Sequence, residues 1–235
     1  TGKVTRVTNS DGSGSGVKVE NGGTFNMYGG TITGNKATTG DLETQKGGGV
    51  YVNGAHSAFN MYGGTITDNT AKNGGGVYVN GGTFTMDGNA SVTNNKTDNS
   101  QSSSGVGVYV NGGTFTMKDG TISGNNATNY PDGGVGLYTT ARFIMDGGTI
   151  SGNEASQGGG VGMYQTAQFI MNGGTISDNT AKNGGGVYVK VTGEGENGGK
   201  FEMNGSAMNG SASVKDNTAS GNTADQGHGG GVYVY

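Results

Sequence analysis

The feature that most constrains this chain is a short repeat in which every Phe is followed, two residues later, by a Met. The seven pairs are Phe25/Met27, Phe59/Met61, Phe84/Met86, Phe115/Met117, Phe143/Met145, Phe169/Met171 and Phe201/Met203. Spacing of two residues places both side chains on one side of an extended strand. The chain therefore contains at least seven similar strands, and its fold must bury seven similar apolar faces.

Two further strand-like segments accompany each Phe-x-Met pair. One has a central Ile or Val between Thr or Ser residues, and an Asn follows it three residues later. These Asn residues are Asn35, Asn69, Asn95, Asn125, Asn153, Asn179 and Asn217. The other segment has the form Gly-[Val/Leu/Met]-Tyr and usually carries a second Val. In two units the second Val is missing, and we expect Val135 and Val161, two residues earlier, to replace its core contact because they have the same parity.

Three strands per unit, each with one apolar face, predict an all-β, right-handed parallel β-helix with three parallel sheets and about seven coils. No single coil can bury its apolar face, whereas stacked coils bury one continuous core. We expect residues 1–235 to form one solenoid segment, with residues 1–13 as an irregular lead-in. The repeat runs up to the last residue without a polar cap, so we also expect a segment excised from a longer protein, or end-to-end contacts through uncapped termini.

The composition excludes several classes of function. The formal net charge is −4 with few Lys and Arg, which argues against nucleic acid as a partner. There is no Cys, so disulfides and thiolate metal sites are excluded. No apolar run approaches the roughly 20 residues of a membrane-spanning helix. We expect no membrane insertion, no metal and no cofactor.

The units G-G-G-V-Y-V, G-G-T-F-T-M and G-G-T-I-S-G-N resemble repeats of bacterial adhesin-like and autotransporter-type surface proteins. The resemblance covers Gly14 to the end of the chain. It implies an extracellular or cell-surface location and a non-enzymatic scaffold or stalk that presents a binding face. The partner would be a host or environmental glycan or protein.

A row of Tyr is the first candidate binding face, because aromatic rings bind sugars and proteins. Its members are Tyr51, Tyr78, Tyr109, Tyr138, Tyr164 and Tyr188, with Tyr233 at the end of the chain. The alternative is a structural ladder in which neighbouring rings only shield one another. The Asn row is interpreted in the same way, as a ladder of amides that bond from coil to coil.

Hydroxyl rows flank the Ile segment and form an alternative face. They contain Thr31, Thr33, Thr65, Thr67, Thr121, Thr149 and Thr175, together with Ser91, Thr93, Ser123, Ser151, Ser177 and Ser213. Paired hydroxyls on a flat β-helix face would suit ice binding, although Thr is also simply common on exposed strands.

No catalytic residue is predicted. Acidic residues are scattered, only two Arg exist (Arg6 and Arg142), and His56 and His228 lie far apart in the repeat. The alternative is a carbohydrate-active enzyme of polysaccharide lyase type. Its site would lie in the irregular stretches Lys36 to Lys46, Lys96 to Ser104 and Thr192 to Asn197.

Overall fold

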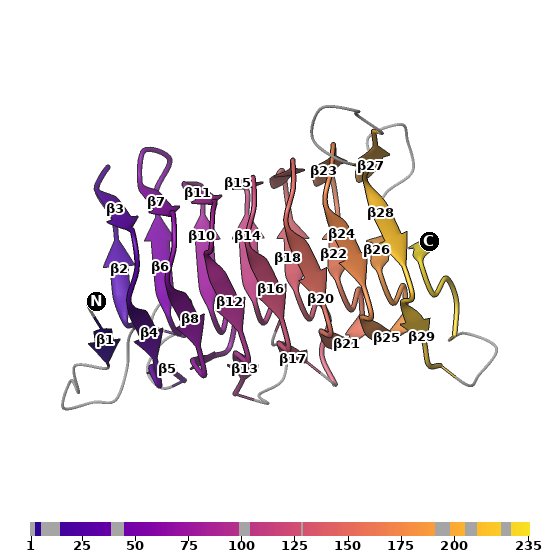
Figure 1. Ribbon diagram of the computed structural model, residues 1–235, viewed down its shortest axis with the longest axis horizontal. Helices are drawn as coiled ribbons and strands as arrows, with labels where there is room; N and C mark the ends of the chain where they lie inside the picture. Colours follow the sequence, from indigo (N-terminus) through magenta and orange to yellow (C-terminus); the bar gives the residue numbers. More distant parts are fainter. Residues whose placement is uncertain are drawn as a thin grey trace.

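The computed structural model describes residues 3–5, 15–38, 45–98, 104–127, 129–190, 198–204, 211–221 and 227–235. These residues form an all-β parallel solenoid in which equivalent strands stack along the long axis (Figure 1). The predicted fold class is thereby confirmed. No helix among the described residues is long and apolar enough to cross a membrane.

Three of the sheets are those expected from the repeat. Sheet A, the Thr-Ile-Thr sheet, contains β1 (Lys3–Thr5), β4 (Thr31–Thr33), β8 (Thr65–Thr67), β12 (Ser91–Thr93), β16 (Thr121–Ser123), β20 (Thr149–Ser151), β24 (Thr175–Ser177) and β28 (Ser213–Lys215). Sheet B, the Val-Tyr-Val sheet, contains β2 (Val17–Val19), β6 (Val50–Asn53), β10 (Val77–Asn80), β14 (Val108–Asn111), β18 (Val135–Tyr138), β22 (Val161–Tyr164), β26 (Val187–Lys190) and β30 (Val232–Val234). Sheet C, the Phe-x-Met sheet, contains β3 (Thr24–Met27), β7 (Ala58–Met61), β11 (Thr83–Met86), β15 (Thr114–Met117), β19 (Arg142–Met145), β23 (Gln168–Met171) and β27 (Lys200–Met203). The strand β1 lies within the expected lead-in and pairs in parallel with β4.

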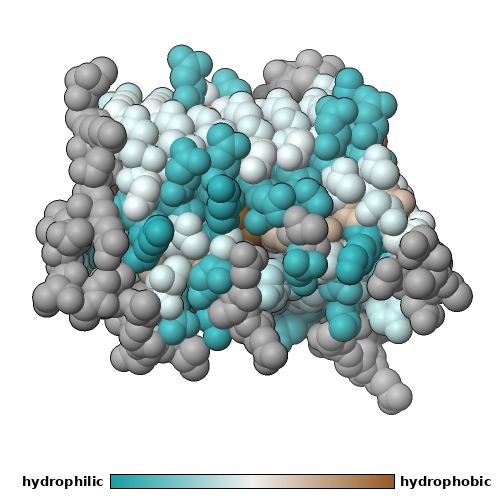
Figure 2. Space-filling model, turned by 90° about the horizontal axis from the view of Figure 1, so that it is seen from below, coloured by the Kyte–Doolittle hydropathy of each residue, from teal (hydrophilic) through white to brown (hydrophobic). Residues whose placement is uncertain are grey.

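A fourth sheet, absent from the sequence prediction, follows the Asn of each coil. Sheet D contains β5 (Lys36–Ala37), β9 (Thr70–Ala71), β13 (Lys96–Thr97), β17 (Asn126–Ala127), β21 (Glu154–Gln157), β25 (Thr180–Asn183) and β29 (Thr218–Ala219). The prediction of three sheets is wrong because most of these strands have two residues and bury one small side chain, such as Ala71 or Ala127. Period-two patterning cannot be detected in two residues. Sheet D runs along the lower side of Figure 1, and Figure 2 shows that hydrophilic residues gather on this face.

The core lies between sheets A, B and C. One Phe and one Met from sheet C, one Ile or Val from sheet A and two aliphatic residues from sheet B enter it from most coils. The Phe rings stack face to face along the axis, with centroids 4.6 to 5.1 Å apart. Each coil therefore packs its own residue types against identical residues, which fixes the register of all the sheets.

The Asn row is the predicted amide ladder, and the hydrogen bonds confirm it. Asn125 is representative: its Nδ2 donates to Asn153 Oδ1 (3.0 Å) and to the backbone oxygen of Val92 (3.1 Å). Its Oδ1 accepts hydrogen bonds from the backbone N–H of Asn95 (3.0 Å) and from Asn95 Nδ2 (3.1 Å). The ladder satisfies buried polar groups at the corner between sheets A and D through direct hydrogen bonds between coils.

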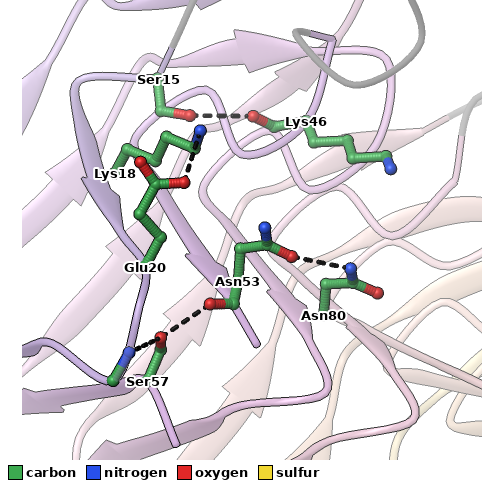
Figure 3. A network of polar contacts seen from close by, with 8 residues as sticks. Ser15, Lys18, Glu20, Lys46, Asn53, Ser57 and Asn80 are labelled. Atoms are coloured by element: carbon green, nitrogen blue, oxygen red, sulfur yellow. Dashed lines mark hydrogen bonds and ion pairs between the residues drawn. The ribbon is translucent and has the colours of Figure 1, made fainter. Parts of the chain in front are cut away.

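A second Asn ladder, not anticipated from the sequence, lies at the end of the sheet B strands. Asn80 Nδ2 donates to Asn53 Oδ1 (2.9 Å), and Asn111 Nδ2 donates to Asn80 Oδ1 (3.0 Å). Figure 3 shows its first step, beside Ser57, whose hydroxyl donates to the backbone oxygen of Asn53 (2.7 Å). This ladder belongs to the outer surface of sheet B and is interrupted after Asn111.

The Gly residues that directly precede the sheet B strands are required by close contact between coils. A Cβ on Gly107 would lie 2.5 Å from the backbone oxygen of Gly134 and 2.9 Å from Asn125 Nδ2. The Gly134 oxygen accepts the backbone hydrogen bond of Val108 N–H, and Asn125 Nδ2 donates the hydrogen bonds of the Asn ladder. Neither neighbour can move without breaking one of these bonds. The high Gly content therefore reflects tight stacking at this corner rather than disorder.

The register of β18 and β22 differs by two residues from the one expected when the Gly-[Val/Leu/Met]-Tyr segments are matched to each other. Val135, rather than Leu137, pairs with Val108, and Leu137 pairs with Val110. Val135 and Val161 are buried as predicted, but they occupy the first apolar position of the strand and do not replace a missing second one. The alignment was wrong because it matched Tyr with Tyr, whereas the buried aliphatic residues determine the register.

Replacing one rung of the first ladder should destabilise the solenoid. We expect Asn125→Ala to lower the free energy of unfolding by about 2–4 kcal/mol, because it leaves buried donors and acceptors unpaired. The measurement is the urea midpoint followed by circular dichroism. The control is Asn126→Ala, an exposed neighbour for which we expect less than about 1 kcal/mol. Equal effects of the two substitutions would contradict the role of the ladder.

Candidate functional site

The predicted Tyr row lies on the outer face of sheet B, and its central rings stack on one another. The ring centroids of Tyr78, Tyr109, Tyr138 and Tyr164 follow at 4.8, 4.6 and 4.6 Å, with interplanar angles of 8° to 12°. Stacked rings cover each other's faces, so a sugar ring cannot lie flat on them. In this part of the row the geometry favours the structural ladder over a binding platform.

Burial differs along the row as well. Tyr51, Tyr78 and Tyr188 are buried, whereas Tyr109, Tyr138 and Tyr164 are half-buried. The ring of Tyr51 meets that of Tyr78 edge to face, at 5.4 Å and 81°. None of these six rings stands as a fully exposed platform.

The stack breaks at the C-terminal end, where the rings tilt. The Tyr188 ring centroid lies 6.0 Å from that of Tyr164 and 5.7 Å from that of Tyr233, with interplanar angles of 48° and 44°. The ring of Tyr235 makes an angle of 42° with that of Tyr233. These tilted rings line a cavity of about 500 Å³. The residues around the cavity are Gln157, Asn183, Tyr188, Lys190, His228, Tyr233 and Tyr235. Aromatic faces beside amide and amino groups form a concave site of the kind that holds a small polar ligand.

A buried carboxylic acid, Asp132, lies beside the stacked part of the Tyr row. It has a φ of 64°, and equivalent positions of the other coils carry Gly with φ between 59° and 64°. These glycines are Gly47, Gly74, Gly105, Gly158, Gly184 and Gly229. The Tyr138 hydroxyl donates to Asp132 Oδ2 (2.5 Å), whereas Oδ1 is buried and accepts no hydrogen bond.

This environment changes the acidity of the groups that it contains. Burial raises the pKa of Asp132 from 3.8 to about 7, although hydrogen bonds from Tyr138 and Tyr164 oppose part of that rise. Burial also raises the pKa values of both Tyr hydroxyls well above 10.0, and the nearby Asp132 adds to the effect. Asp132 therefore carries a proton over much of the acidic range, and both tyrosines stay neutral.

The hydroxyl rows of sheet A are in register over six strands. Thr31 pairs with Thr65, and Thr33 pairs with Thr67. The rows continue through Ser91, Thr121, Thr149 and Thr175 on one side and through Thr93, Ser123, Ser151 and Ser177 on the other. Thr and Ser alternate irregularly, and Lys215 follows Ser177. The side chains of the rows are half-buried on the strand surface, except for the buried Ser177.

Among the described residues, those considered for catalysis are not brought together, and Arg6 lies outside the described residues. Arg142 is an exposed residue of β19 in sheet C, between Thr114 and Gln168 of neighbouring coils. Within the described ranges, no group of three or more His, Asp or Glu side chains could hold a metal ion. Thr192 to Asn197 and the middle parts of the other two irregular stretches, 39–44 and 99–103, lie outside the described residues.

Sequence reasoning missed Asp132 and the cavity. The signal for Asp132 was present, because Asp-Gly-Gly-Val replaces Gly-Gly-Gly-Val in one unit, and Gly136 and Gly162 stand in register with Tyr109. The cavity could not be found in this way, because it depends on ring tilts. No family model, curated protein or solved structure matches this chain, so the functional argument rests on its own geometry.

The buried acid predicts a pH dependence of stability. The folded-state pKa of Asp132 lies above the unfolded value, so folding binds a proton between pH 3.8 and about 7. This contribution to stability is fully present below pH 3.8 and is lost as the pH rises to about 7. At about 1.4 kcal/mol per pKa unit, the loss is at most about 4 kcal/mol.

Urea midpoints between pH 4 and 8 measure this effect. Asp132→Asn should remove most of the fall, because the amide keeps the shape and cannot ionise. Asp178→Asn is the matched control, since Asp178 has a φ of 57° but is exposed. A wild-type profile that Asp132→Asn leaves unchanged would refute the assignment.

Proposed function

We propose that this chain is a non-enzymatic, adhesin-like segment of an extracellular or cell-surface protein whose C-terminal cavity binds a glycan. The observation that carries the proposal is the tilt of Tyr188, Tyr233 and Tyr235 away from the stack. The tilt leaves Tyr233 and Tyr235 outside the parallel stack: Tyr235 is 69% exposed, Tyr233 is half-buried with the His228 ring stacked on it at 5.2 Å, and both line the cavity. Sugars stack their C–H faces on such rings and use hydroxyls for hydrogen bonds.

The polar groups of the cavity support a saccharide ligand. Gln157 and Asn183 provide amides, and Lys190 provides an amino group on the strand β26. Amides both donate and accept, which suits the vicinal hydroxyls of a sugar. The preceding coils form regular parallel sheets, and these sheets support the C-terminal strands that line the cavity.

The alternative is a carbohydrate-active enzyme. An enzyme needs acid and base groups that meet at one place, and the described side chains bring no such pair into the cavity apart from Lys190 and His228. Non-catalytic retention of a glycan is therefore the function that the geometry supports best.

A polysaccharide panel, scored for both retention and product release, tests the proposal. We expect retention of at least one polysaccharide without release of oligosaccharides. Tyr233→Ala should weaken retention about tenfold or more, because it removes a ring face from the cavity. Release of oligosaccharides would instead establish an enzyme, and absence of both signals would leave a stalk or a protein-binding module.

The matched control for Tyr233→Ala is Tyr28→Ala at the opposite end of the molecule. Tyr28 is 75% exposed and stacks on Tyr62 at 5.1 Å, away from the cavity. Tyr28→Ala should leave retention unchanged. If Tyr28→Ala abolishes retention and Tyr233→Ala does not, the binding site has been assigned to the wrong end.

A further inference from the structure

Asp132 occurs together with a coordinated change in two sheet B strands. The outward position in the middle of the strand is a Tyr in β14 (Tyr109) and in β26 (Tyr188). In the two strands between them, the same position is a Gly: Gly136 in β18 and Gly162 in β22. The tyrosines of those two strands stand two residues later. There Tyr138 pairs with Asn111, and Tyr164 pairs with Lys190. The second Asn ladder stops where these tyrosines begin.

The two glycines are required by the carboxyl group. A Cβ on Gly162 would lie 1.7 Å from Asp132 Oδ1, and a Cβ on Gly136 would lie 2.7 Å from Oδ2. Without side chains at these positions, the displaced Tyr rings lean back into the row and remain stacked at 4.6 Å. Their hydroxyls then reach Asp132. Five residues therefore act as one unit: an acid, two glycines and two displaced tyrosines.

This unit touches the wall of the cavity through Tyr164. The Tyr164 hydroxyl donates to Gln157 Oε1 (3.4 Å), and the Tyr164 ring packs against Tyr188 at 6.0 Å. Both Gln157 and Tyr188 line the cavity. A single hydroxyl, that of Tyr164, is thus shared between the buried acid and the wall of the cavity.

We propose that Asp132 is a positioning residue for the cavity: its protonation state determines whether the Tyr164 hydroxyl stays on Gln157, and so sets the affinity of the site. The inference rests on the proposed function. When Asp132 is neutral, its carboxyl group carries a donor proton and is a weak acceptor, so the Tyr164 hydroxyl keeps its hydrogen bond to Gln157. When Asp132 is ionised, its unpaired Oδ1 competes for the Tyr164 hydroxyl, because a charged acceptor binds a hydroxyl more strongly than a neutral amide does.

Among the described residues, no Lys, Arg or His contributes to the shift in the pKa of Asp132. The titratable groups that act on it are tyrosines of four neighbouring strands: Tyr109 of β14, Tyr138 of β18, Tyr164 of β22 and Tyr188 of β26. All four hydroxyls have raised pKa values, so they stay neutral near neutral pH and can donate a hydrogen bond to an ionised carboxylate. The acid changes charge near pH 7, so the switch operates between about pH 6 and 8.

The test compares glycan affinity at pH 6 and pH 8 in the intact chain. We expect wild-type affinity to fall about three- to tenfold at pH 8, which corresponds to the loss of one hydrogen bond at the wall. Asp132→Asn should keep its affinity over this range, and the exposed control Asp178→Asn should behave like wild type. Because His228 also lines the cavity, the series is repeated with His228→Gln, in which we expect the same difference between pH 6 and pH 8.

A second readout needs no ligand. The side-chain amide resonances of Gln157 should shift with a midpoint near pH 7 in wild type and stay constant in Asp132→Asn. Retention without this shift, or a pH profile that survives in Asp132→Asn, would overturn the inference. A Gln157 shift without retention of any glycan would reject the proposed function and leave the positioning role intact.

Discussion

The constraint on which the rest of this structure depends is that equivalent residues of neighbouring coils stack on one another, so that a repeated side chain must be compatible with a copy of itself. Coils repeat about every 4.8 Å, so each side chain meets the equivalent residue of the neighbouring coils, which is often a copy of itself. Asn satisfies this condition, because its amide donates on one side and accepts on the other, as Asn125 does between Asn95 and Asn153. The same rule selects Phe on Phe in the core and Gly on Gly at the tight corner.

The rule also explains why most of the aromatic row does not offer a binding platform. Identical rings in register stack on one another, and stacking hides the faces that a sugar would use. Binding capacity can arise only where the repetition is broken. Besides the edge-to-face contact of Tyr51 with Tyr78, the described part of the Tyr row breaks the repetition at Asp132 and at the tilted rings from Tyr188 onward, and Tyr164 links these last two places.

Much of the frame was predictable from the sequence, because the Phe-x-Met and Asn positions recur with few exceptions. Sheet D escaped prediction since one Ala in a two-residue strand gives no periodic signal. The register of β18 was misjudged because Tyr138 was matched to Tyr109, while the buried Val135 and Leu137 decide the pairing. The cavity was not predictable, because ring tilt depends on packing rather than on residue order.

The measurement that tests the account most directly is the titration of the Asp132 side-chain carboxyl carbon by NMR. It reports on one group, independently of any ligand and of global stability. The account predicts a midpoint near pH 7, since the acid is enclosed by Tyr138, Tyr164 and the two glycines. A midpoint near 3.8, the value of an ordinary Asp, would show a solvated carboxylate and would contradict the arrangement on which the positioning role depends.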